Sequence, residues 1–261
     1  MFMEERHQAI LEVIAQNGRI TIGEIQEKFE VSLDSARRDL RILEEKQLLK
    51  RTHGGAISLR QADSRPPRVR DFSKMEVVYP HYDAIARRAA QEIRENDVAY
   101  LTSGSIGFLM LAHLPRDFHY TLVVNSVALA NELKYWDNVE VYIVGGKMRM
   151  HGTASLVDGF AQDFIAGMQM DLCLMTGAGV DAAFGFSNCT AETAAFQRAV
   201  VAHSRRKLLL LPNEKVGFRA VLKVCDANAF DTLITDDQAT EDELLRLEEQ
   251  GLEIIVVETK E

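Results

Sequence analysis

Residues 31–45 read VSLDSARRDLRILEE, and this stretch decides how the amino-terminal part of the chain folds. On a helical wheel at about 100° per residue, one face is apolar and consists of Leu33, Ala36, Leu40 and Leu43. The other faces are polar and carry Asp34, Ser35, Arg37, Arg38 and Arg41. The pattern predicts a helix that packs through one face and presents arginine and serine on the other. Such a helix fits the major groove of DNA, although an ordinary surface helix with a solvated charged face has the same pattern.

The preceding residues complete a helix-turn-helix. Apolar residues within 10–14 recur at helical spacing and predict a first helix that ends near the Asn-Gly pair. Thr21 and Glu24 have the spacing of a capping box, so a second helix is expected to begin there. Residues 30–31 form a short break, and Ser32 suits the N-cap of the third helix. Three helices with a tight turn between the second and third form this motif.

Residues 48–59 (LLKRTHGGAISL) predict a small hairpin, or wing, that turns at its glycine pair. A hairpin turn by itself explains the glycines, and the cations beside them suggest phosphate contacts. We expect Arg38 to read a guanine edge, and Arg37, Arg51 and His53 to contact phosphate. The full predicted DNA-binding set is Ser32, Asp34, Ser35, Arg37, Arg38, Arg41, Arg51, His53, Gly54 and Gly55.

Three motifs together resemble the DeoR family of bacterial transcription regulators: RHQAILEVIAQNG at 6–18, SARRDLRILEE at 35–45 and RTHGGA at 51–56. The resemblance extends over essentially the whole chain. It departs at Ser35 and Ala36, where the family usually has threonine and a branched aliphatic residue. The resemblance implies a winged helix-turn-helix followed by a domain similar to ribose-5-phosphate isomerase in fold, which senses phosphorylated sugars or related metabolites.

Length and charge favour two domains. Residues 1–75 carry 14 basic and 12 acidic residues, whereas the remainder of the 261-residue chain carries 16 and 27. An acidic net charge of −9 therefore does not argue against DNA binding, because the relevant field is local. Residues 61–75 (QADSRPPRVRDFSKM) have the composition of a linker. We expect a DNA-binding domain at 1–60, the linker at 61–75 and an effector-sensing and oligomerisation domain at 76–261.

Several classes of protein are disfavoured. The sequence has no apolar run of 18 residues, and its charged, amphipathic amino terminus is unlike a signal peptide. Three scattered cysteines without a C-x-x-C pair fit a reducing compartment. Histidine spacing matches no metal motif. We therefore expect a cytoplasmic protein that needs no metal and no cofactor.

Residues 76–261 alternate between strand and helix patterns. Strands are expected at 98–101, 121–124, 139–144, 172–175, 207–211, 232–234 and 253–257. Helices are expected at 83–93, 127–133, 160–168, 193–203 and 241–249, with a further helix directly after residues 102–107. This order predicts an α/β domain with a mostly parallel sheet covered on both faces. Ligands of such domains bind beyond the carboxyl ends of the strands.

Five successive strand ends carry small, polar or cationic residues, and together they predict a pocket for a small phosphorylated ligand. Any one of them alone would be only a tight turn. The residues are Ser103, Gly104, Ser105, Asn125, Ser126, Gly145, Gly146, Arg149, Gly177, Asp181 and Lys215. The DeoR resemblance matches most of these positions and also 155–157 and Gly217. It adds Glu192, which stands one place earlier than the family pattern. Because Thr102 and Gln197 also depart from that pattern, the ligand can differ from a common hexose phosphate, or the response can be lost.

Two functions fit such a chain. The first is a transcription regulator, expected to be a homodimer or homotetramer on operator DNA, with its DNA affinity set by a phosphorylated sugar-like effector. The second is a sugar-phosphate isomerase or deaminase in which Asp181, Glu192 and Lys215 supply acid–base groups. A bare enzyme does not need residues 1–60, and the chain lacks the lysine and glycine run of the isomerases. The sequence therefore favours the regulator.

Overall fold

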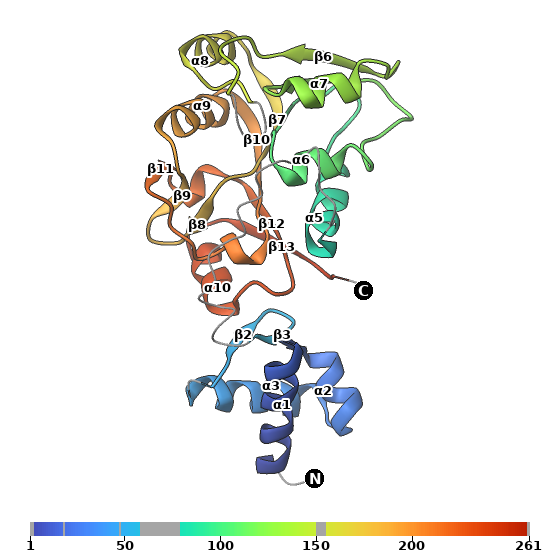
Figure 1. The fold of residues 1–261 in the computed structure, drawn as a ribbon, viewed down its shortest axis with the longest axis vertical. Helices are drawn as coiled ribbons and strands as arrows, with labels where there is room; N and C mark the ends of the chain where they lie inside the picture. Colours follow the sequence, from blue (N-terminus) through green and yellow to red (C-terminus); the bar gives the residue numbers. More distant parts are fainter. Residues whose placement is uncertain (1–2, 18, 47, 58–78, 150–154, 260–261) are drawn as a thin grey trace.

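The computed structural model describes residues 3–17, 19–46, 48–57, 79–149 and 155–259. A small amino-terminal domain lies at one end of the molecule and a larger α/β domain at the other (Figure 1). The linker predicted at 61–75 lies outside the described residues, so it stays a prediction. Among the described residues, no helix has the length and apolar character needed to cross a membrane.

The amino-terminal domain is a winged helix-turn-helix, as the sequence predicts. Its helices are α1 (Met3–Asn17), α2 (Ile22–Phe29) and α3 (Leu33–Glu45). Its antiparallel sheet has the order β1-β3-β2, formed by β1 (Arg19–Thr21), β2 (Lys50–Thr52) and β3 (Gly55–Ile57). The hairpin of β2 and β3 is the predicted wing. Strand β1 was not predicted, because three residues are too short to show an alternating pattern.

Local capping explains where the helices begin. Thr21 and Glu24 form the predicted capping box, in which each side chain accepts a hydrogen bond from the other residue's backbone N–H. Glu30 takes a left-handed conformation (φ 53°, ψ 44°) and ends α2. Ser32 then accepts the N–H of Ser35 and caps α3. The turn between α2 and α3 is therefore set by local hydrogen bonds.

The core of this domain corrects the helical-wheel reading at two positions. Ala36, Leu40 and Leu43 are buried as predicted, but the side chain of Leu33 is 42% exposed because it lies on the first turn of α3. Asp39, a charged residue that the wheel did not assign to the core, is only 2% exposed. It accepts hydrogen bonds from Arg6 Nε (2.6 Å) and Nη2 (3.1 Å), and also bonds His7 (3.1 Å). A buried carboxylate thus joins α3 to α1.

The larger domain is built on a parallel seven-stranded sheet of order β13-β12-β10-β7-β4-β5-β6. Its strands are β4 (Val98–Leu101), β5 (Tyr120–Val124), β6 (Val139–Ile143), β7 (Met170–Met175), β10 (Ser204–Leu210), β12 (Thr232–Asp236) and β13 (Glu253–Val257). All seven predicted strands are confirmed, and the bounds of β4 and β13 agree residue for residue. The predicted mostly parallel α/β architecture is therefore confirmed.

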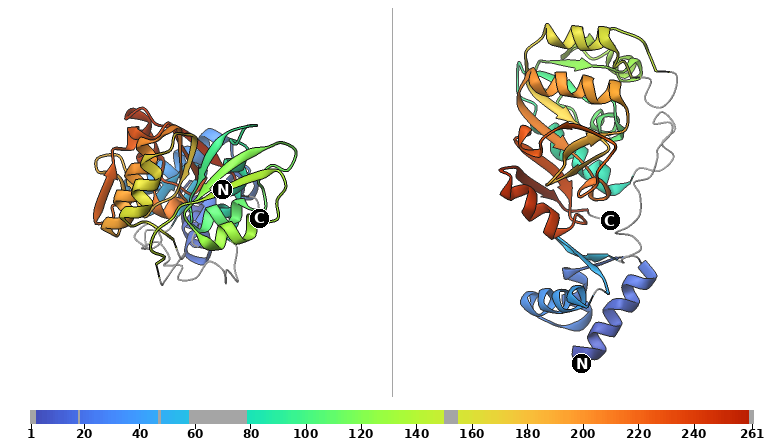
Figure 2. Two further views of the ribbon diagram at one scale, coloured as in Figure 1. Left: turned by 90° about the horizontal axis from the view of Figure 1, so that it is seen from above. Right: turned by 90° about the vertical axis from the view of Figure 1, so that its left-hand side faces the viewer.

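Helices cover both faces of this sheet. Along β7, Leu172 and Leu174 pack into one apolar cluster while Cys173 and Met175 pack into the other, as the alternation of a strand requires. The first cluster lies under α5 (Pro80–Ala90), α6 (Ser105–Met110) and α7 (Val127–Leu133). The second lies under α8 (Gly159–Ala166), α9 (Ala191–Ala202) and α10 (Glu241–Glu249). Both views in Figure 2 show this layered arrangement.

A second, antiparallel sheet of order β11-β9-β8 was not predicted. It consists of β8 (Gly179–Asp181), β9 (Gly185–Asn188) and β11 (Leu222–Cys225). Glycine begins β8 and β9, and these strands are short, so neither reads as a strand by periodicity. The described residues of this domain also include the short 3₁₀ turns η2 (Asn213–Lys215) and η3 (Ala227–Ala229).

Candidate DNA-binding surface and ligand cavity

The outer face of α3 is exposed and cationic. Arg37, Arg38 and Arg41 are all exposed, as the sequence predicts for a helix that presents its polar face. Asp34 lies exposed in the first turn, and the hydroxyls of Ser32 and Ser35 bond each other (3.0 Å) at the start of the helix. All five predicted polar residues of α3, together with Ser32, therefore surround one end and one side of the helix. This polar side of α3 is therefore mostly exposed.

The wing residues, unlike the polar residues of α3, contact other parts of the protein. Arg51 Nε donates to Glu44 Oε2 (2.8 Å), and its Nη2 lies 3.0 Å from Glu241 Oε2 on α10. The N–H groups of His53 and Gly54 donate to backbone oxygens of the larger domain (2.9 and 3.0 Å). The hairpin thus points toward the larger domain, which the right-hand view of Figure 2 shows. Gly55 is buried, and an added Cβ would lie 2.0 Å from the oxygen of Ile20, so only glycine fits there.

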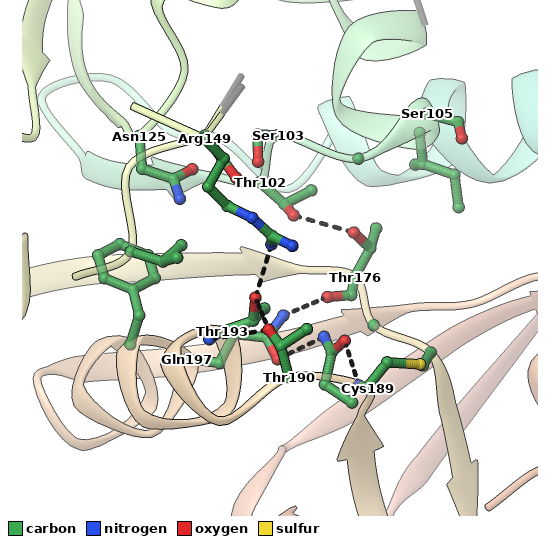
Figure 3. Close-up of a pocket in the computed structure, with 18 of the residues that line it drawn as sticks. Thr102, Ser103, Ser105, Asn125, Arg149, Thr176, Cys189, Thr190, Thr193 and Gln197 are labelled. Atoms are coloured by element: carbon green, nitrogen blue, oxygen red, sulfur yellow. Dashed lines mark hydrogen bonds between the residues drawn. The ribbon is translucent and has the colours of Figure 1, made fainter. Parts of the chain in front are cut away.

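A polar cavity of about 310 Å³ lies beyond the carboxyl ends of the central strands. Thr102 follows β4, Asn125 follows β5 and Thr176 follows β7, so neighbouring strands bring these residues to one edge. The amino-terminal turn of α9 supplies Thr190 and Thr193 from the other side (Figure 3). The volume is that of a site for a small organic molecule.

Hydrogen bonds between lining residues hold this cavity in shape. The hydroxyls of Thr102 and Thr176 bond each other (2.9 Å), and Gln197 Nε2 donates to the backbone oxygen of Thr176 (2.8 Å). Asn125 accepts from the hydroxyl of Tyr100 (3.1 Å) and donates to a backbone oxygen. Most buried amides and hydroxyls are therefore fixed in orientation before a ligand arrives.

Two cations line the cavity. Arg149 extends over it in Figure 3 and donates from Nη1 to the hydroxyl of Thr193 (3.0 Å). Lys215, on η2, lies with its Nζ 6.0 Å from the ring centre of Tyr82. Burial lowers the pKa of Lys215, although the nearby carboxylate of Glu214 opposes this. No carboxylate is among the lining residues that the structure describes, so the cavity favours an anionic ligand.

One lining residue, Gly177, is confined by the core packed against it. An added Cβ at Gly177 would lie 2.1 Å from Cε2 of Phe186, whose ring is fully buried in the core. Gly177 thus lines the cavity with its backbone while the Phe186 ring packs against it in the core. No side chain fits between them without displacing the ring.

Seven of the predicted effector residues line the cavity: Ser103, Gly104, Ser105, Asn125, Arg149, Gly177 and Lys215. The other five lie outside it, and their contacts are those of turns and caps. Ser126 caps α7, and Gly145 and Gly146 form the turn after the edge strand β6. Glu192 is exposed on the first turn of α9.

Asp181 has a structural environment outside the cavity. Its carboxylate accepts the N–H groups of Ala183 (2.9 Å) and Phe184 (2.7 Å) and pairs with Arg219 (2.8 Å). Burial alone would raise the pKa of Asp181, but the Arg219 and backbone hydrogen bonds outweigh it and lower this pKa. These contacts close the turn between β8 and β9.

Sequence reasoning left several lining residues out of its predicted set. They include Thr102, Thr176, Cys189, Thr190, Thr193 and Gln197. Thr176 stands directly after a strand, so the strand-end rule could have found it. Cys189 and Thr190 follow the unpredicted β9, and no local pattern places them at the cavity. Among the described residues, no group of three or more metal-ligating side chains is positioned to hold an ion.

A helix-turn-helix with a cationic outer face, joined to a parallel α/β domain with a polar cavity, defines a two-domain regulator. Comparisons with known families agree. Residues 6–62 match the DeoR-like helix-turn-helix domain, and residues 79–237 match the DeoR C terminal sensor domain. The chain belongs to the DeoR family and is a DNA-binding transcriptional regulator.

Several transcription regulators are similar to this chain over nearly its full length. The HTH-type transcriptional regulator GolR of Listeria innocua is 25% identical, over 99% of this chain and 100% of that protein. The repressor GlcR of Bacillus subtilis is 27% identical, over 100% and 99%. The glycerol-3-phosphate regulon repressor of Escherichia coli is 25% identical, over 90% and 92%. Among solved structures, ribose 5-phosphate isomerase A of Methanocaldococcus jannaschii aligns with 10% identity and a TM-score of 0.38, over 51% and 52% of the two chains.

Proposed function

We propose that this regulator represses genes of carbohydrate metabolism and that a phosphorylated sugar or related metabolite in the cavity sets its affinity for DNA. The observation that carries the proposal is that Arg149 and Lys215 line the cavity together with hydroxyl and amide groups, with no carboxylate among the lining residues that the structure describes. A phosphate group satisfies the cations, and the polar groups are suited to sugar hydroxyls. Relatives named as repressors, including one of a glycerol-3-phosphate regulon, support the same class of effector.

DNA recognition is assigned to α3. Arg38 is exposed on the polar side of α3 and would form a bidentate contact with a guanine edge. Arg37, Arg41 and the wing cations are suited to phosphate contacts, which position the helix without reading sequence. Two or four copies of the chain would place recognition helices on the half-sites of a palindromic or repeated operator, and the larger domain would join them. As a DNA-binding regulator it would act in the cytoplasm.

The positions of the acid–base residues disfavour the isomerase or deaminase alternative. The acid–base set considered for it comprised Asp181, Glu192 and Lys215. Only Lys215 lines the cavity, since Asp181 is bound in a turn and Glu192 is exposed. We therefore propose that the cavity binds its ligand without converting it.

A two-part experiment tests this proposal. Fluorescence anisotropy compares a duplex from the region upstream of the chain's own gene with a random duplex of equal length. A thermal-shift screen of the full chain then compares phosphorylated sugars with their unphosphorylated counterparts, because a ligand of the folded state raises apparent stability. We expect preference for the upstream duplex, a shift with a phosphorylated compound only, and altered DNA affinity in its presence. Equal affinity for both duplexes under all conditions would contradict the proposal.

A further inference from the structure

The tip of the wing is bound to one short segment of the larger domain. We call residues 236–241, which connect β12 to α10, the clasp segment. His53 N–H donates to the oxygen of Ala239 (2.9 Å), Gly54 N–H donates to the oxygen of Asp237 (3.0 Å), and Arg51 pairs with Glu241 (3.0 Å). We propose that the clasp segment competes with DNA for the wing, with Glu241 holding Arg51 where a DNA phosphate would. This proposal rests on the proposed DNA contacts of the wing.

The cleft beside the clasp segment has the character of a phosphate site. It has a volume of about 260 Å³ and lies between the wing, α3 and α10. Its described lining residues include Arg37, Arg41 and Arg51, with His53 beside them and Glu241 as the acid. Carboxylate and phosphate oxygens bind a guanidinium with the same geometry. Glu241 therefore presents to this cationic surface the same chemistry that a DNA strand presents.

The clasp is suited to reversible release. The Arg51 side chain is 21% exposed and that of Glu241 is 42% exposed, so solvent screens their attraction. Arg51 keeps its second partner, Glu44 on α3, when Glu241 leaves. The two backbone donors of the wing tip can exchange carbonyl oxygens for water or for phosphate oxygens. Several phosphate contacts together can thus outweigh the clasp.

The clasp segment is also joined to the ligand cavity. Its first residue, Asp236, is fully buried and accepts hydrogen bonds from the backbone N–H (2.7 Å) and side-chain amide (2.9 Å) of Asn213. Asn213 begins η2, and Lys215 at the other end of η2 lines the cavity. One end of the clasp segment therefore contacts the element that carries Lys215, and the other end contacts Arg51. A ligand that repositions η2 would bias the wing through this segment.

Hydrogen exchange of the free full-length chain tests the clasp without DNA. Glu241→Gln removes the charge that holds Arg51, and Asp242→Asn is the matched control. Asp242 has the same charge in the same turn of α10 but pairs with Arg246. We expect the amides of residues 53–54 to exchange faster in Glu241→Gln than in the wild type or the control. Gly54→Val is a second variant, because a Cβ there would lie 3.3 Å from that of Asp237 and a larger side chain would push the tip away.

DNA affinity gives the second readout. Against a random-sequence duplex, we expect Glu241→Gln to bind about two- to fivefold more tightly than wild type, the range of a partly exposed ion pair. In an Arg51→Ala background this gain should disappear, because Glu241 then has no Arg51 guanidinium to keep from DNA.

The outcomes separate the clasp from the proposed function. Wild-type exchange at residues 53–54 in both Glu241→Gln and Gly54→Val would overturn the clasp. So would a gain in affinity that Asp242→Asn shares or that persists in the Arg51→Ala background. Faster exchange in both variants with no DNA binding by any form would support the clasp as a contact and contradict its role as a competitor of DNA. It would also count against the proposed function itself.

Discussion

The two domains hold their functional residues in opposite ways. On α3, Arg37, Arg38 and Arg41 are exposed on the polar side, and a buried carboxylate fixes the inner face. In the cavity, hydroxyls and amides are bonded to one another and to backbone groups before any ligand is present. Groove contacts are therefore completed when DNA binds, whereas the cavity is largely preformed. Substitutions on the exposed face of α3 should change binding alone, while substitutions that unpair buried groups should also change stability.

The largest expected effect lies under the exposed face, at Asp39. Replacing Asp39 with alanine leaves Arg6 and His7 partly or wholly buried without their acceptor. We expect a loss of about 3–5 kcal/mol in the free energy of unfolding of the amino-terminal domain. Urea titration of the full chain, followed by hydrogen exchange within α1 and α3, measures this. Asp34→Ala on the exposed side of the same helix is the control, and equal losses would show that Asp39 has no special role.

The next effect concerns the cavity. Lys215→Gln should weaken binding of a phosphorylated ligand by about 1.5–3 kcal/mol, because a charged hydrogen bond is lost. Burial lowers the pKa of Lys215, so its proton is lost at lower pH than from an ordinary lysine. Ligand affinity should therefore fall as pH rises through that lowered pKa. Isothermal titration across alkaline pH measures this, and Lys215→Arg should remove the fall. A pH dependence shared by Lys215→Arg would place its origin elsewhere.

Arg38→Ala should relax sequence preference by about 1–3 kcal/mol and leave thermal stability unchanged. The reason is that Arg38 is exposed and would contact a base edge without packing in the core. Competition between the upstream duplex and single-base variants of it gives the measurement. Arg41→Ala is the matched exposed arginine on the same helix. Preserved preference in Arg38→Ala would assign base reading to another residue.

The smallest effect is expected at the wing. Arg51→Ala should lower the slope of log affinity against log salt by about one unit, because one phosphate contact is lost. All duplex sequences should weaken alike, in contrast to Arg38→Ala. Anisotropy titrations at several salt concentrations measure the slope, and an unchanged slope would remove Arg51 from the phosphate contacts.

Much of the fold could be predicted from the sequence because its signals are local. The capping box at Thr21, the N-cap at Ser32 and the alternation of buried strands depend on neighbouring residues alone. Strand β1 and the small sheet of β8, β9 and β11 could not, because these strands have only three or four residues. In addition, β1 pairs with the distant β3 and β11 pairs with the distant β9. The burial of Asp39 depends on Arg6 and His7, more than thirty residues away.

The cavity was only partly predictable for a related reason. Residues directly after the neighbouring strands β4 and β5, such as Ser103 and Asn125, do line it. After the edge strand β6 the prediction holds only in part: Gly145 and Gly146 lie outside the cavity, with Gly146 against Asp158, whereas Arg149 lines it. Strand order in the sheet is a tertiary property, which the sequence pattern does not contain. Placing Thr190 and Thr193 likewise required the hairpin of β8 and β9.

The contact between Gly177 and the ring of Phe186 restricts how this cavity can change during evolution. Because any side chain at Gly177 would displace a core aromatic ring, a new ligand preference cannot easily arise by substitution at this lining position. Variation can enter more readily at Thr190 and Thr193, which lie on a helix turn at the opposite side. Relatives that respond to different metabolites should then differ mainly along the first turn of α9, and ancestral or designed changes of specificity are best sought there.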